Sequence, residues 1–113
     1  MTTIVLLNDV NEEHLQAVKT EMAALGCPSI RAIDDGYRLI AIEGSHRLRA
    51  AEELGIAVNI EIVEEDADID LYTLDWDHGG WFDERVVSGR EFIEGFLRYP
   101  ISDNHPTAVI QVI

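Results

Sequence analysis

The sequence contains few basic residues, one cysteine and three prolines. Eight Lys and Arg residues stand against 22 Asp and Glu residues, which gives a formal net charge of −14. Because nucleic-acid backbones and anionic membranes attract basic surfaces, this balance argues against a protein that coats nucleic acid or docks on a membrane. The single cysteine, Cys27, excludes an internal disulfide framework and a thiolate zinc cluster.

The sequence also lacks an apolar run of transmembrane length and a basic-then-apolar leader. We therefore expect a soluble, cytoplasmic protein. Hydrophobic residues make up 47% of the 113 positions, which is enough to build a core. Residues 1–113 are accordingly expected to form a single domain.

The acidic residues are concentrated in one segment. Ten of the 22 lie between Glu61 and Glu84, where no Lys or Arg occurs. Two interpretations of this acidic segment stay open: a solubility-promoting surface, or a face that binds a divalent metal or a partner. Asp66, Asp68 and Asp70 would share one face of a strand, but the glycine and the terminal glutamate of an EF-hand are missing. We predict no metal site there.

Trp76 and Trp81 flank a Gly-Gly pair in the same segment. Such a loop could stack on a base or close as a lid. It could equally fill the end of a small core or bury a contact between two copies, so a homodimer is a candidate assembly.

Apolar spacing and turn signals predict strands and helices that mix without strict alternation. Asn11 is typical of a helix N-cap, Gly26 of a helix end, and Asp34-Asp35-Gly36 of a hairpin. Ser88-x-x-Glu91 is a capping box. The expected strands are 3–7, 30–33, 38–42, 58–62 and 107–113, and the expected helices are 12–25, 45–54 and one from 88 onward. We predict one small α+β domain with a mixed sheet and about three helices.

A candidate anion site lies at the start of the helix expected at 45–54. Gly44 permits a tight turn and the close approach of a ligand, and the N–H groups of the first helical turn attract anions. Ser45 supplies a hydroxyl, and His46, Arg47 and Arg49 add further donors.

The order of charges along this helix also favours an anion at its start. Arginines stand near the N-terminus and glutamates near the C-terminus, which opposes the helix dipole and costs about 0.3–1 kcal/mol per charge. An Arg49–Glu53 pair and an Arg47–Glu43 contact would offset most of this cost without a ligand. A purely structural interpretation therefore stays open.

The segment from Glu43 to Gly55 resembles the Gly-x-His-Arg-x-x-Ala-Ala-x-x-Leu-Gly box of the ParB/sulfiredoxin superfamily. The surrounding pattern is similar to the ParB N-terminal domain over roughly residues 5–66. The resemblance implies a ParB/sulfiredoxin-like fold in which Gly44, Ser45, His46 and Arg47 line a nucleotide-phosphate site. Arg49 matches a further arginine of the CTP-binding members. The sequence lacks their DNA-binding module, and Ser45 stands where sulfiredoxins have their reactive cysteine.

In size the chain is most similar to the stand-alone members with an Asp-Gly-His-His-Arg box, which include kinases of free serine. This resemblance implies a nucleotide (ATP, ADP or CTP) as cofactor, with Mg²⁺. It also implies a general-base glutamate near the start of the first helix, and Glu12 and Glu13 lie in the comparable region. A second interpretation stays open, in which these two acids only compensate the helix dipole. Glu43, in place of the box aspartate, is a third catalytic candidate for metal or proton transfer.

Two functions of different classes follow from these observations. The first is a nucleotide-dependent phosphotransferase or hydrolase that acts on a phosphate-bearing small molecule. It requires Glu12, Glu13 or Glu43 close to the turn that holds Ser45 and Arg47. The second is a non-enzymatic protein-interaction module on a ParB-like scaffold, with the acidic segment or the tryptophan loop as its binding face.

Overall fold

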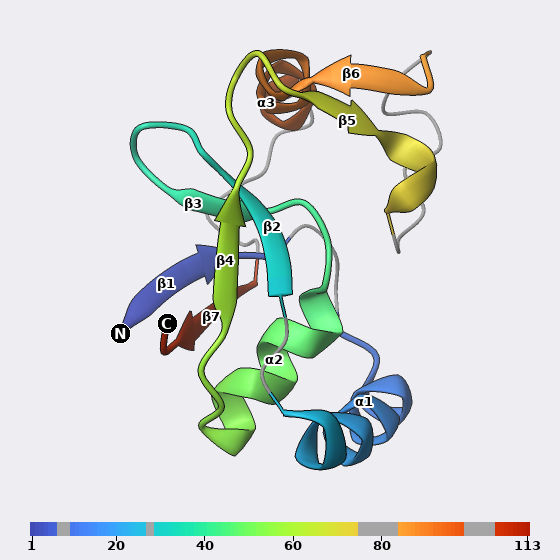
Figure 1. The fold of residues 1–113 in the computed structure, drawn as a ribbon, viewed down its shortest axis with the longest axis vertical. Coiled ribbons are helices and arrows are strands. Elements are labelled where there is room, and N and C mark those ends of the chain that lie inside the picture. Colours follow the sequence, from blue (N-terminus) through green and yellow to red (C-terminus); the bar gives the residue numbers. More distant parts are fainter. Residues whose placement is uncertain (7–9, 27–28, 75–83, 99–105) are drawn as a thin grey trace.

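The computed structural model describes residues 1–6, 10–26, 29–74, 84–98 and 106–113. Within these ranges, three α-helices accompany a five-stranded mixed sheet and a two-stranded hairpin, so the chain forms a single α+β domain (Figure 1). The helices are α1 (Glu12–Leu25), α2 (Ser45–Leu54) and α3 (Gly89–Arg98), and a short 3-10 helix, η1, covers Leu71–Thr73. The strands are β1 (Thr2–Val5), β2 (Ser29–Asp34), β3 (Leu39–Ala41), β4 (Asn59–Ile62), β5 (Asp68–Asp70), β6 (Val86–Ser88) and β7 (Thr107–Ile110).

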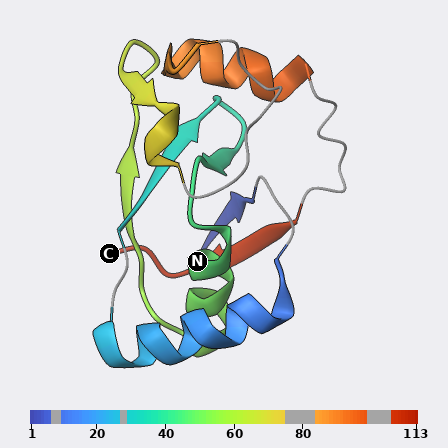
Figure 2. The ribbon, with the colours of Figure 1, turned by 90° about the vertical axis from the view of Figure 1, so that its right-hand side faces the viewer.

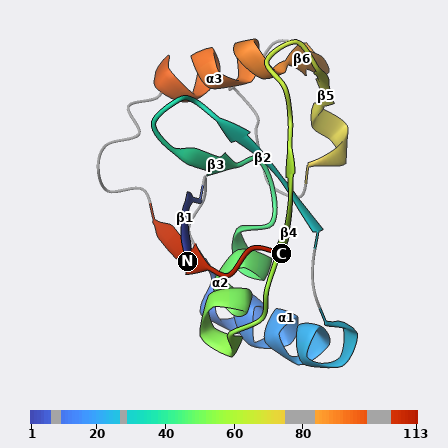
Figure 3. The same ribbon diagram turned by 60° about the vertical axis from the view of Figure 1, so that its left-hand side comes forward.

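The larger sheet has the strand order β4-β2-β3-β1-β7. Parallel pairs join β1 to β3 and β2 to β4, and antiparallel pairs join β2 to β3 and β1 to β7. Beyond β7 the chain turns toward the opposite edge, where Val112 pairs in parallel with Val58 (Figure 3). The sheet therefore curls until its two edges meet at one point.

Apolar side chains cover both faces of this sheet. Ile30 and Ala32 pack into a core with α1 and α2, whereas Ile33 points to the other face, as strand alternation requires. On that second face, Phe92 of α3 packs with Ile69 and Leu71. Figure 2 shows the resulting layers, with α1 and α2 below the sheet and α3 above it.

Local signals set the ends of the helices. The side chain of Asn11 accepts the N–H of His14 at 3.0 Å and starts α1. The capping box at the start of α3 makes both of its reciprocal bonds: Glu91 N–H donates to Ser88 Oγ, and Ser88 N–H donates to Glu91 Oε1, each at 3.1 Å. Gly26 ends α1 with a φ of 85°. These predictions from sequence are confirmed.

The expected closing strand at 107–113 is shorter than predicted. β7 ends at Ile110 because the next residues leave β1 and bond to Val58 instead. Cys27 and the Trp76–Trp81 loop lie outside the described residues. None of the described helices combines the length and apolarity that a membrane crossing needs.

Candidate functional site

The candidate site is the turn between β3 and α2. Gly44, the N-cap of α2, has a left-handed backbone with a φ of 75°. A Cβ at this position would also collide with Cδ1 of Ile30, a fully buried side chain. The left-handed backbone therefore favours glycine here, and any side chain would also force Ile30 to shift. The carbonyl of Gly44 accepts the N–H of Leu48 at 2.8 Å, which begins the helix.

The guanidinium of Arg47 lies beside this glycine. A Cβ built on Gly44 would be 3.3 Å from Nη2 of Arg47 and 3.4 Å from its Nε. Nη1 of Arg47 donates to the carbonyl of Ser29 at 3.5 Å. Ser45, the first residue of α2, is 4% exposed. The turn thus places a buried serine and an arginine at one helix start.

His46 joins the start of α2 to the start of α1. Its Nε2 accepts a 2.9 Å hydrogen bond from the backbone N–H of Asn11, the N-cap of α1. Its ring meets the ring of His14 edge-on, with the centroids 4.4 Å apart. The two helices therefore begin close to each other, on the right-hand side of Figure 1. Each helix start carries the positive end of a dipole, and in α1 the carboxylates of Glu12 and Glu13 stand in the same turn.

Glu43 is held by Arg31, and the charge of Arg47 also acts on its carboxylate. Arg31 Nε lies 2.7 Å from Glu43 Oε2, and Arg31 Nη2 lies 2.9 Å from Glu43 Oε1. Burial alone would raise the pKa of the Glu43 carboxyl, but the hydrogen bonds and charge of Arg31, with the charge of Arg47, outweigh it and lower that pKa. Glu43 is therefore ionised, and it holds Arg31 next to the β3–α2 turn.

Arg31 is a residue that reasoning from sequence missed. Its Nη2 also donates to Oγ1 of Thr73 at 3.0 Å, and Thr73 in turn donates to the carbonyl of Asp70 at 2.6 Å. Arg31 thereby connects the β3–α2 turn to η1 on the hairpin side of the sheet. The available signal was a lone charge in the apolar run Ile30–Ile33, but nothing in the sequence names its partners.

Arg49 makes a structural pair along α2. It pairs with Glu52, whose other carboxylate oxygen accepts the N–H of Val109 in β7 at 2.6 Å. The expected Arg49–Glu53 pair is wrong, because the β7 backbone holds Glu52 next to Arg49. Glu53 instead lies 4.0 Å from Nζ of Lys19 in α1.

Glu12 and Glu13 are exposed in the first turn of α1, directly after Asn11. Glu12 Oε1 accepts a hydrogen bond from Gln16 Nε2 at 2.9 Å. Because Asn11 is bonded to His46, this turn begins next to the start of α2. The turn that carries these two glutamates therefore lies next to the candidate site.

One carboxylate of the acidic segment, that of Asp70, is paired locally with an arginine. Asp70 receives both Nε and Nη2 of Arg85 at 3.1 Å, and it also accepts the N–H of Tyr72. These bonds lower the pKa of Asp70, with the hydrogen bonds from Arg85 as the largest cause. Among the described residues, no three His, Cys, Asp or Glu side chains are grouped to hold a metal ion.

Comparison with protein-family models, with curated proteins and with solved structures finds no match to this chain. The resemblance to the ParB/sulfiredoxin superfamily therefore stays a prediction from the box at residues 43–55.

Proposed function

We propose that this chain binds a phosphate-bearing small molecule, a nucleotide, where α1 and α2 begin. The observation that supports this most is the bond between Asn11 and His46, because it brings a second helix start to the turn that holds Arg47. Phosphate oxygens bind well to the positive ends of helix dipoles, to backbone N–H groups and to guanidinium groups. The box at residues 43–55 predicts the same ligand independently of the geometry.

If binding leads to phosphoryl transfer or hydrolysis, Glu12 or Glu13 is the better candidate for the general base. Both oxygens of Glu43 are occupied by Arg31, and the lowered pKa of Glu43 makes it a weak base. Glu12 and Glu13 are exposed and follow the residue bonded to His46. Mg²⁺ would be brought by the nucleotide phosphates.

Calorimetric titration with ATP, ADP, CTP and pyrophosphate, each with Mg²⁺, tests the binding. We expect at least one of them to bind, and Arg47→Ala to weaken that binding about tenfold or more, the effect of losing one charge-assisted contact. Arg38→Ala is the matched control, since it removes an exposed arginine from the tip of the β2–β3 hairpin. Equal affinity of Arg47→Ala and the native chain, or no binding of any titrant, would contradict the proposal.

Phosphate release tests the catalytic part separately. We expect Glu12→Gln or Glu13→Gln to abolish turnover while leaving nucleotide affinity nearly unchanged. Glu43→Gln should instead weaken affinity, because it disturbs the base of the turn. If the native chain binds a nucleotide without measurable turnover, the catalytic part of the proposal is wrong and the chain is a nucleotide-binding module.

A further inference from the structure

The edge strands of the five-stranded sheet are β7 and β4, and their outward backbone groups have different partners. On β7, the outward N–H of Val109 donates to the carboxylate of Glu52. A charged side chain placed on an edge strand is a common way to prevent pairing with another chain. One outward backbone donor of the β7 edge is therefore satisfied from within the domain.

The register of β4 shows which of its backbone groups face outward. Val63 N–H donates to Ala32 O at 2.8 Å, so the odd-numbered residues of β4 bond to β2 in the parallel ladder. Val58 has the opposite parity, and it bonds outward: its N–H donates to Gln111 O at 2.8 Å and its carbonyl accepts Ile113 N–H at 3.1 Å. By the same alternation, the N–H and C=O groups of Ile60 and Ile62 face outward.

The outer ladder thus begins at Val58 and has no further backbone partner at Ile60 or Ile62 in the described part of the chain. Ile62 keeps 48% of its surface exposed, and the neighbouring Glu61 is exposed. Four backbone hydrogen-bonding groups and a partly exposed apolar side chain therefore lie in a row along this edge. Such an edge can accept an extended segment by β-strand addition.

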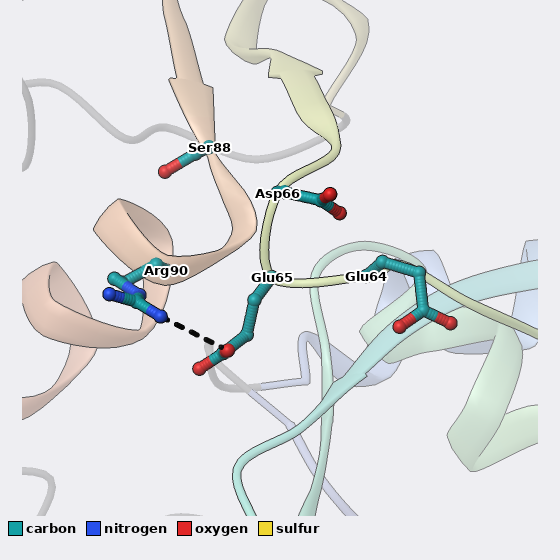
Figure 4. Close-up of a pocket in the computed structure, with 5 residues that line it drawn as sticks. All are labelled: Glu64, Glu65, Asp66, Ser88 and Arg90. Atoms are coloured by element: carbon teal, nitrogen blue, oxygen red, sulfur yellow. Dashed lines mark hydrogen bonds and ion pairs between the residues drawn. The ribbon is translucent and has the colours of Figure 1, made fainter.

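The surface that follows β4 is acidic. Glu64, Glu65 and Asp66 line an open cavity of about 650 Å³ with Ser88 and Arg90. Arg90 lies 3.4 Å from Glu65, whereas Glu64 and Asp66 point away from it (Figure 4). One cation therefore balances only part of this charge, and Glu61 on the strand adds to it.

We propose that the outer edge of β4 binds an extended segment of a partner protein that carries lysine or arginine. The backbone of this segment would pair with Ile60 and Ile62, and its basic side chains would face Glu61 and the carboxylates of Glu64 and Asp66. A second copy of this chain fits poorly, because two chains of charge −14 would bring their acidic edges together. None of these β4-edge and acidic residues belongs to the proposed nucleotide site.

The probe is a ten-residue synthetic peptide of alternating lysine and valine, titrated against the full chain by fluorescence anisotropy. We expect binding, together with slower hydrogen exchange at the amides of Ile60 and Ile62. The same peptide with a central proline should bind about tenfold more weakly or worse, because proline removes a ladder donor. A peptide with glutamate in place of lysine should not bind. Equal binding of the proline peptide would overturn the proposal, because attraction by charge alone would then suffice.

Two variants locate the contact. Ile62→Pro deletes an outward N–H that β2 does not use, and it should abolish peptide binding while the melting temperature stays close to native. Glu61→Lys should weaken binding more than Glu21→Lys, a matched charge reversal on the exposed surface of α1. If Ile62→Pro does not fold, Glu61→Lys and the exchange at Ile60 decide the question. Equal weakening by both lysine variants would overturn the proposal, as would a dimer in light scattering with these amides already protected.

Discussion

Nε2 of His46, in the first turn of α2, accepts a hydrogen bond of 2.9 Å from the backbone N–H of Asn11, the N-cap of α1. The bond joins residues 35 positions apart in the sequence. It determines where the first turn of α1 lies relative to the β3–α2 turn. Together with the packing of α1 against α2, this contact holds the two helix starts of the proposed site side by side.

Replacing this imidazole should loosen the junction. We expect His46→Ala to lower the free energy of unfolding by about 0.5–1.5 kcal/mol, since the Asn11 N–H loses its acceptor. Urea denaturation measures the loss, and faster hydrogen exchange at Asn11 locates it. His14→Ala removes only the edge contact of the two rings and should leave exchange at Asn11 unchanged. Unchanged exchange at Asn11 in His46→Ala would show that the bond does not hold α1 in place.

Gly44 and Gly55 form a matched pair for testing the turn. Both have a positive φ, but a Cβ at Gly55 meets nothing within 4 Å, whereas one at Gly44 collides with Ile30. Gly55→Ala should cost about 1–2 kcal/mol for the left-handed backbone. Gly44→Ala should cost about 1–3 kcal/mol more, because the packed core must also shift. Equal losses in chemical denaturation would mean that Ile30 moves aside freely.

The Arg31–Glu43 pair should make stability depend on pH. Because folding lowers the pKa of Glu43, its contribution is complete above the unfolded-state pKa and is lost as the pH falls through the folded-state pKa. Glu43→Gln should be about 1.5–3 kcal/mol less stable than the native chain at about pH 7. This gap should narrow as the pH falls below about 5. A gap that stays constant in denaturation experiments across this range would rule out the ion pair as its cause.

Glu52 should protect the β7 edge. In Glu52→Ala the N–H of Val109 and the guanidinium of Arg49 both lose their partner, so we expect a loss of about 1–3 kcal/mol and more self-association. Light scattering at rising concentration measures the second effect. Glu53→Ala is the control, because the 4.0 Å contact of Glu53 with Lys19 is partly exposed and contributes little. Self-association of both variants to the same degree would show that lost charge is responsible.

Acid should reproduce this effect in the native chain. The pKa of Glu52 is lowered chiefly by the hydrogen bond from Val109 N–H, and the hydrogen bond and charge of Arg49 also lower it. The carboxylate therefore protects the edge above its unfolded-state pKa, and the protection is lost as the pH falls through its folded-state value. We expect the native chain to approach the scattering of Glu52→Ala in acid.

Much of the architecture could be predicted from local patterns. The bounds of α2 agree with the prediction because Gly44 and Gly55 mark its two ends, and both glycines adopt the left-handed backbone that other residues avoid. The capping box at Ser88 and the Asn11 cap act within four residues of themselves, so they can be recognised without a tertiary structure. The α+β class follows from the mixture of these elements.

The pairing of side chains could not be predicted in this way. Glu52, Glu53 and Arg49 lie within one helical turn or so, and several pairings satisfy helical spacing equally well. Val109, which is far away in the sequence, bonds to Glu52, and this bond determines which glutamate Arg49 pairs with. In the same way, Arg31 pairs with Glu43 because β2 and β3 are neighbours in the sheet.

The sequence by itself determined the elements, the glycine turn at Gly44 and the acidity of residues 61–84, because each depends on conformational preference or composition over a short stretch. Only the tertiary structure decided that two helix starts lie close together, that β4 has outward-facing backbone groups, and that Val109 N–H of β7 bonds to Glu52. Packing of α1 against α2 and the curl of the sheet bring distant residues together. Those contacts depend on three-dimensional proximity, which the spacing of residues along the chain does not specify.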